Sequence, residues 1–96
     1  MSDKKIYKIN LGGDIIYVDD KCIPHRLCGP AIEKKDGKKC WYLNGKQHRI
    51  DGPAIESKDC LEWWINGCKF SSKEEWFKAL PEEDQITYLF NIEGTK

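Results

Sequence analysis

The chain lacks an excess of charge of either sign, because its sixteen lysine and arginine residues balance sixteen aspartate and glutamate residues. A dedicated nucleic-acid-binding domain usually carries a basic excess, so the charge balance disfavours a nucleic-acid partner. The sequence also lacks a long hydrophobic stretch, and its longest apolar run of four residues is far too short to span a membrane. Met1–Lys8 contains no apolar segment of the kind found in export signals. We therefore expect a soluble protein without a membrane partner.

A chain of 96 residues is too short for a Rossmann-type domain, a (β/α)₈ barrel or a two-lobed enzyme. Apolar residues make up 40% of the sequence and charged residues 33%, which is typical of a globular protein rather than a disordered one. We expect a single domain over residues 1–96, with a thin core.

The five cysteines also exclude a framework built wholly of disulfides, because an odd number leaves at least one thiol unpaired. Together with the missing export signal, this indicates a reducing compartment, and we expect a cytoplasmic protein. The charges are distributed unevenly: residues 1–49 carry a net charge of +5 and residues 50–96 a net charge of −5. This polarity could arise by chance on a solvated surface, steer a charged partner, or favour head-to-tail association of two copies.

An internal repeat is the strongest feature that the sequence does contain. HRLCGPAIE at residues 25–33 recurs as HRIDGPAIE at residues 48–56, with seven of nine positions identical. WYLNGK at 41–46 recurs as WWINGC at 63–68, and IYVDDK at 16–21 is a degenerate earlier copy. The residues that we assign to the recurring structural motif are His25, Arg26, Gly29, Pro30, His48, Arg49, Asp51, Gly52 and Pro53. The chain is therefore nearly three copies of one unit.

Each unit has the pattern of a β-hairpin. Residues 30–35 and 38–43 predict two short strands, and the intervening Asp36-Gly37 predicts a two-residue type I′ turn. Asn44-Gly45 and Asn66-Gly67 predict further tight turns, whereas Cys60 occupies the position of Gly37 in a shorter loop that must turn differently. Residues 5–10 and 14–18, separated by two glycines, predict one more hairpin. We expect a meandering antiparallel sheet of six to eight strands over residues 1–70.

After Phe70 the apolar period changes from that of a strand to that of a helix. Ser72 and Glu75 form the pattern of a capping box, and Trp76, Phe77 and Leu80 follow on one helical face. Pro81 opens a second helix, in which Ile86, Leu89 and Phe90 recur at helical spacing. We expect helices over residues 72–80 and 81–92 whose apolar faces cover the sheet. The fold class is therefore mainly β (α+β), with the hairpin repeat sheet capped by residues 71–96.

The repeat is similar to the small H-R-x-D-G-P-A repeat proteins of tailed bacteriophages, which resemble MORN-type β-hairpin repeats at a distance. The resemblance covers residues 16–70 and depends most on WYLNGKQHRIDGPA at 41–54. It implies a phage or prophage origin, a bacterial host cell, and an accessory protein that binds and inhibits host machinery or an antiviral defence. Cys28 departs from the pattern at the position of Asp51, and Pro24 departs from it at the position of Gln47. A role assigned to the second copy therefore transfers only in part to the first.

His48 and Asp51 suggest general acid–base chemistry, since such pairs can transfer protons. The alternative is structural: Arg49 pairs with Asp51 across a turn, and His48 packs against an aromatic ring of the neighbouring unit. Repetition favours the structural role, because an active site is normally built once. We therefore predict a protein that is not an enzyme.

Cys22, His25 and Cys28 form a C-x₂-H-x₂-C pattern that could contribute to a zinc site, with Cys40 or His48 as a fourth ligand. Buried cysteines also serve as small apolar residues, and no second close pair of cysteines is present. We predict no bound metal or other cofactor, and keep this triad as the alternative.

Adjacent aromatic residues in a strand point to opposite faces of the sheet, so each unit should expose one ring beside an arginine. Such a row could bind a protein, for which Trp, Tyr and Arg are favoured, or stack a small nucleotide. The neutral net charge favours a host or defence protein as the partner, and sequestration of a nucleotide signal, by an oligomer or a monomer, is the alternative. The helical tail could instead cover these rings. The candidate contact residues are Arg26, Trp41, Tyr42, Arg49, Trp63 and Trp64.

Overall fold

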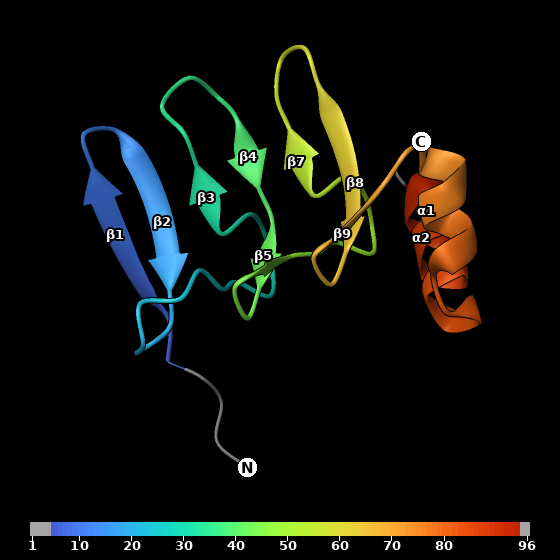
Figure 1. Cartoon of the computed structure of the whole chain (residues 1–96), viewed down its shortest axis with the longest axis horizontal. Helices are drawn as coiled ribbons and strands as arrows, with labels where there is room; N and C mark the ends of the chain where they lie inside the picture. Colours follow the sequence, from blue (N-terminus) through green and yellow to red (C-terminus); the bar gives the residue numbers. More distant parts are fainter. Residues whose placement is uncertain (1–4, 95–96) are drawn as a thin grey trace.

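The computed structural model describes residues 5–94, with side chains up to residue 90. Its hairpins follow one another along the molecule from β1 to β9, and the two helices close the end beyond β9 (Figure 1). The nine strands are β1 (Tyr7–Leu11), β2 (Asp14–Val18), β3 (Ile32–Glu33), β4 (Lys39–Cys40), β5 (Tyr42–Leu43), β6 (Lys46–Gln47), β7 (Ile55–Glu56), β8 (Leu61–Ile65) and β9 (Cys68–Phe70). The predicted mainly β class with two C-terminal helices is confirmed.

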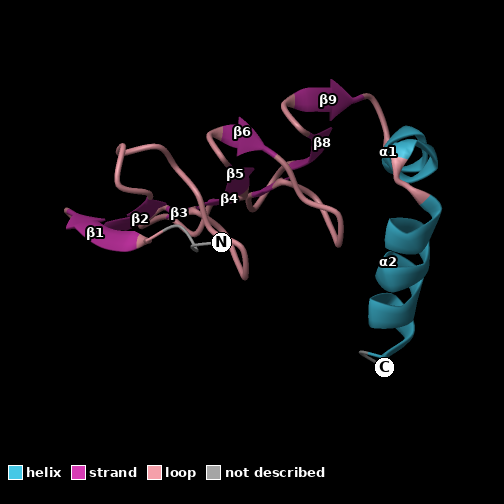
Figure 2. Cartoon of the chain, turned by 90° about the horizontal axis from the view of Figure 1, so that it is seen from below, coloured by secondary structure: helices cyan, strands magenta, loops and turns pink. Residues whose placement is uncertain are grey.

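All strand pairs are antiparallel, and seven strands form one sheet in the order β1-β2-β3-β4-β7-β8-β9. Strands β5 and β6 form a separate two-stranded sheet, which lies beside the main one in Figure 2. The expected return strand over 38–43 is divided at Trp41 into β4 and β5. Because of this division the structure has nine strands in two sheets, where the sequence predicted six to eight in one.

Backbone hydrogen bonds link each unit to the next in the same way. Trp41 N donates to Ala54 O at 2.7 Å, and Tyr17 N donates to Ala31 O at 2.7 Å one unit earlier. Tyr17 therefore occupies the place of Trp41, so the predicted alignment of residues 16–21 with 41–46, which pairs Ile16 with Trp41, is wrong by one residue. Ala31 and Ala54 are completely buried at these junctions. A larger side chain at either position would have to enter a closely packed space, which explains the alanine in both copies of the motif.

The glycine-containing turns are set by local backbone chemistry. Asn44 and Gly45 have φ of 53° and 82°, and Asn66 and Gly67 have φ of 48° and 83°. Positive φ at both central residues defines the type I′ turn that matches the twist of a hairpin, so both predicted tight turns are confirmed. The predicted N-terminal hairpin is confirmed as β1 and β2.

The predicted type I′ turn at Asp36-Gly37 is wrong. Lys34 N donates to Lys38 O at 2.8 Å, so Lys35, Asp36 and Gly37 form a three-residue loop. Gly37 N donates to Lys34 O at 2.9 Å, and only Gly37 of these three has positive φ, at 101°. This is a type I turn followed by a left-handed glycine, the usual solution for a three-residue hairpin loop. The later copy differs as expected: Ser57 N donates to Cys60 O at 2.9 Å, which closes a two-residue loop.

The helices provide the largest buried side chains. Helix α1 (Lys73–Ala79) begins after Ser72, whose hydroxyl accepts a hydrogen bond from Glu75 N at 3.2 Å, as the capping pattern predicted. Helix α2 (Glu82–Gly94) follows Pro81. Trp76, Leu80 and Tyr88 form the buried core of this end. The partly buried side chains that pack against it belong to Ile50, Trp63, Ile65, Phe70 and Phe77.

The predicted covering face of the second helix is wrong. Ile86, Leu89 and Phe90 are 61%, 50% and 76% exposed, whereas Tyr88 is buried. The Tyr88 ring packs edge-on against Trp76 at 5.1 Å between ring centres, and this contact sets the rotation of α2 about its axis. Neither helix is long and apolar enough to cross a membrane.

Candidate functional site

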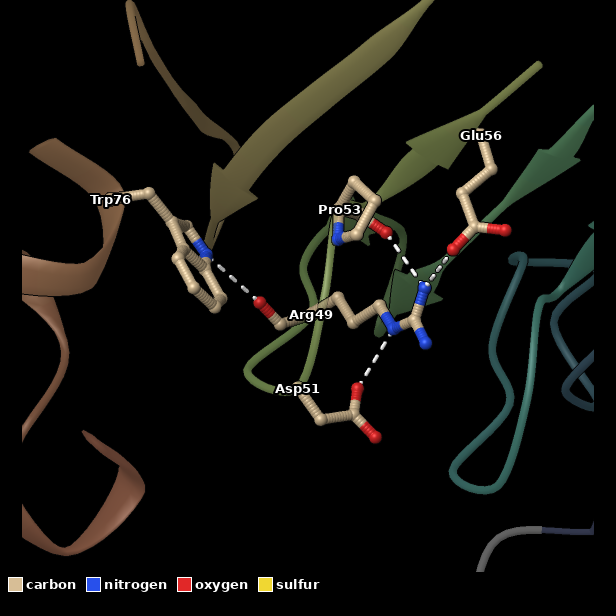
Figure 3. Close-up of polar contacts among 5 residues, drawn as sticks. All are labelled: Arg49, Asp51, Pro53, Glu56 and Trp76. Carbon is tan, nitrogen blue, oxygen red and sulfur yellow. Dashed lines mark hydrogen bonds and ion pairs between the residues drawn. The ribbon is translucent and has the colours of Figure 1, made fainter. Parts of the chain in front are cut away.

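Arg49 occupies the centre of the joint between the second and third units (Figure 3). Its guanidinium donates from Nε to Asp51 at 2.8 Å, and from Nη1 to Pro53 O at 3.0 Å and Glu56 at 2.7 Å. The same group lies 3.8 Å from the centre of the Trp41 ring. The predicted Arg49–Asp51 pair is confirmed, and the side chain is held by three acceptors and one aromatic face.

Arg26 has an equivalent place one unit earlier. Its Nη1 donates to Pro30 O at 3.0 Å and to Glu33 at 3.2 Å, and its guanidinium lies 4.0 Å from the centre of the Tyr17 ring. Arginine provides this planar set of donors in a fixed geometry, which lysine cannot reproduce. The two arginines therefore form one recurring structural joint.

Gly29 and Gly52 leave room for these guanidinium groups. A Cβ atom at position 52 would lie 2.7 Å from Arg49 Cζ, and one at position 29 would lie 3.1 Å from Arg26 Cζ. Contacts this short would displace side chains that are already fixed by ion pairs. The close approach of the guanidinium explains the glycine of the motif.

The two histidines form an equally regular joint. His25 Nδ1 accepts a hydrogen bond from Asn44 N at 2.9 Å, and His48 Nδ1 accepts one from Asn66 N at 3.0 Å. Each histidine therefore holds the Asn-Gly turn of the following unit. His48 is not hydrogen-bonded to Asp51, whose carboxylate binds Arg49 instead. The pair on which the catalytic alternative depends, His48 and Asp51, is therefore not hydrogen-bonded among the described residues.

Burial lowers the pKa of the His48 imidazole from its ordinary value of 6.5, and the Asp84 carboxylate opposes part of this effect. The neutral ring is also the form that the joint requires, because a protonated Nδ1 could not accept the Asn66 hydrogen bond. Burial likewise raises the pKa of Tyr42 and of the Cys40 thiol.

We expect the protein to become less stable as the pH falls below about 6.5. In this range unfolded His48 binds a proton that folded His48 excludes, so the free energy of unfolding decreases with falling pH until the lowered folded pKa is reached. Urea denaturation at a series of pH values measures this slope. In the His48→Gln variant the slope should be shallower, and an unchanged slope would assign the effect to another group.

The six candidate contact residues do not all line one pocket. Arg26, Trp41 and Arg49 line the same pocket, whereas Tyr42 and Trp64 lie outside it. Trp63 packs against Trp76 at 4.7 Å between ring centres, in the core under α1. Trp64 is half-buried and donates from Nε1 to Glu62 at 3.0 Å. All four rings are half-buried, and one ring of each pair is covered from within the chain: Trp41 by Arg49, and Trp63 by Trp76 as the alternative of a helical cover expected.

The pocket lined by Arg26, Trp41 and Arg49 is open and has a volume of about 500 Å³. Arg26, Cys28, Trp41, Arg49 and Asp51 contribute to its lining, with His48 at one side. Its apolar lining also comes from residues that the sequence did not identify as candidates: Leu27, Leu43 and Ile50. Leu27 is 78% exposed, the most exposed of the large hydrophobic side chains that the structure describes.

The alternative metal ligands are not brought together. Cys22 and Cys28 are exposed, and His25 is buried with Nδ1 bonded to Asn44. Within residues 5–90, no three His, Cys, Asp or Glu side chains are close enough to hold a metal ion. The spacing of Cys22, His25 and Cys28 therefore does not correspond to a convergent set of ligands.

Comparisons with protein-family models, with curated protein sequences and with solved structures gave no match to this chain.

Proposed function

We propose that the protein is a non-enzymatic phage accessory protein, acting in the cytoplasm of a bacterial host, that binds and inhibits or modulates a host or defence protein. The phage origin and the class of partner rest on the resemblance of the repeat motif. A binding role is supported by the open pocket, which is lined by the exposed Leu27 and by two arginines, Arg26 and Arg49. Exposed apolar side chains beside Trp and Arg are typical of protein interfaces.

The histidines and arginines support a role without catalysis. His48 and Arg49 make bonds that His25 and Arg26 repeat in the preceding unit, so these side chains build the fold twice. These contacts account for the repeated motif without assigning it a catalytic role.

Binding of a small nucleotide is the second candidate, because the volume of the pocket falls in the range of small-ligand sites. The guanidinium of Arg49 already covers one face of the Trp41 ring, which leaves less aromatic surface for stacking a base. This contact favours the protein partner over the nucleotide.

The proposal is tested by capture from bacterial lysate with the tagged protein, followed by titration calorimetry with the purified partner. We expect a stoichiometric protein partner whose affinity falls at least about tenfold in Leu27→Asp. Leu61→Asp is the matched control, because Leu61 is also exposed, at 58%, but does not line the pocket. Equal affinities of the two variants would contradict this interface. A lysate without a stoichiometric partner, combined with a thermal shift on adding nucleotides, would favour the second candidate.

A further inference from the structure

The two arginines differ in one contact. The Nη1 atoms of Arg26 and Arg49 make matching bonds to a proline carbonyl and a glutamate, and each guanidinium lies on the aromatic ring of the preceding hairpin. Only Arg49 has a carboxylate on Nε, which Asp51 provides at 2.8 Å. Cys28 stands at the equivalent position of the first unit.

The Nε atom of Arg26 is left without an acceptor among residues 5–90. In the described part of the chain, every fully buried side-chain nitrogen or oxygen has a hydrogen-bond partner. Because this Nε atom has none, it is not fully buried. The side chain as a whole is 28% exposed, so solvent reaches a guanidinium whose other edge is already fixed. A fixed, partly desolvated guanidinium binds a carboxylate with less loss of side-chain freedom than a mobile surface arginine does.

The surroundings favour an acidic group beside an apolar one. Arg26 and Cys28 line the pocket together with Leu27, Leu43 and Ile50. An apolar neighbour would cover Leu27 and exclude water from the ion pair, which strengthens the pairing.

We propose that the Nε edge of Arg26 is a binding site for the side-chain carboxylate of an aspartate or glutamate on the partner protein, with an apolar partner residue seated on Leu27. The partner's carboxylate takes the place that Asp51 fills inside the chain in the next unit. This inference rests on the proposed function, because it identifies the chemistry of the partner at the same pocket.

Two arginines in the whole chain make the site directly observable, because the ¹⁵N-labelled protein gives two Nε–Hε signals. An Arg26→Lys variant assigns them. The probe is sodium acetate, titrated against sodium chloride at equal ionic strength. We expect the Arg26 signal to move downfield and saturate with acetate, while the Arg49 signal, already bonded to Asp51, stays in place.

The Cys28→Asp variant supplies the missing carboxylate from within the chain. Its Arg26 signal should lie downfield without acetate and should not respond to it, and its affinity for the captured partner should fall at least about tenfold. Cys28→Ser is the matched control and should behave like the wild-type protein in both measurements. Equal movement of the two arginine signals, or an unchanged acetate response in Cys28→Asp, would overturn the site.

The two proposals fail separately. If acetate binds at Arg26 but Cys28→Asp retains full affinity for the partner, the carboxylate site is not part of the interface and this inference is wrong. If no partner is captured, the proposed function fails, and with it the assignment of the carboxylate to a protein. The acetate response then still decides whether Arg26 is an anion site.

Discussion

Replacing Trp76 with alanine is expected to destabilise the protein by about 3–5 kcal/mol and to release both helices from the sheet. Trp76 is fully buried and contacts Trp63 and Tyr88 at 4.7 and 5.1 Å between ring centres. It also donates from Nε1 to Arg49 O at 3.1 Å, the contact drawn between α1 and the repeat in Figure 3. Chemical denaturation followed by circular dichroism at a helical wavelength measures the loss.

Trp76→Phe separates the two contributions of this side chain. The phenyl ring preserves most of the buried surface but removes the donor to Arg49 O, which should cost about 1–3 kcal/mol. If Trp76→Ala leaves the midpoint of denaturation unchanged, the helices do not contribute to the stability of the sheet, and the proposed cap is wrong.

Replacing Arg49 with alanine has the second largest expected effect, a loss of about 2–4 kcal/mol in the free energy of unfolding. The substitution leaves Pro53 O, Asp51 and Glu56 without their donor and uncovers the Trp41 ring. Urea denaturation monitored by tryptophan fluorescence provides the measurement. Arg49→Lys should recover little, because an ammonium group cannot reach three acceptors in this planar arrangement.

Arg26→Ala is the natural control for Arg49→Ala. Arg26 holds one carboxylate where Arg49 holds two, so its loss should be smaller. A further control uses Gly52→Ala, whose Cβ would lie 2.7 Å from Arg49 Cζ. The cost of this substitution should largely disappear in the Arg49→Ala background. A cost that is equal in both backgrounds would assign it to the backbone instead.

The hairpins could be predicted because their turns are determined locally. An Asn-Gly pair adopts positive φ at both positions at little cost, and both such pairs closed two-residue turns as expected. Asp36-Gly37 looked equivalent but lies in a three-residue loop, since Lys34 pairs with Lys38. The register of the flanking strands determines the length of that loop, and this register cannot be read from the Asp-Gly pair alone.

The orientation of α2 could not be read from apolar periodicity. Ile86, Leu89 and Phe90 recur at helical spacing, yet the helix buries Tyr88 because Trp76 offers it an aromatic contact. This contact depends on how α1 lies against β8 and β9, and is therefore a property of tertiary packing. Periodicity identified the helix correctly and its buried face incorrectly.

The candidate site was predicted only in part, for a related reason. Arg26, Trp41 and Arg49 do line one pocket, but Arg49 and Trp41 are bound to each other, a pairing between units that their spacing did not reveal. No pattern in the sequence identified the exposed Leu27 as a pocket residue. The repeat shows cysteine at position 28 where the second copy has Asp51, but the sequence does not show that Asp51 binds Nε of Arg49.

The contact of Trp63 with Trp76 determines where the array of hairpins stops. Tyr17 and Trp41 are each covered by the arginine of the following unit, whereas Trp63 is covered by a tryptophan from α1. Helix α1 therefore places Trp76 on the ring of Trp63, where the earlier units have the arginine of the next repeat. The position of α1 in the sequence therefore sets the number of units, and we expect that inserting one more unit of 22 or 23 residues before Trp63 would add the equivalents of both hairpins, β3–β4 and β5–β6.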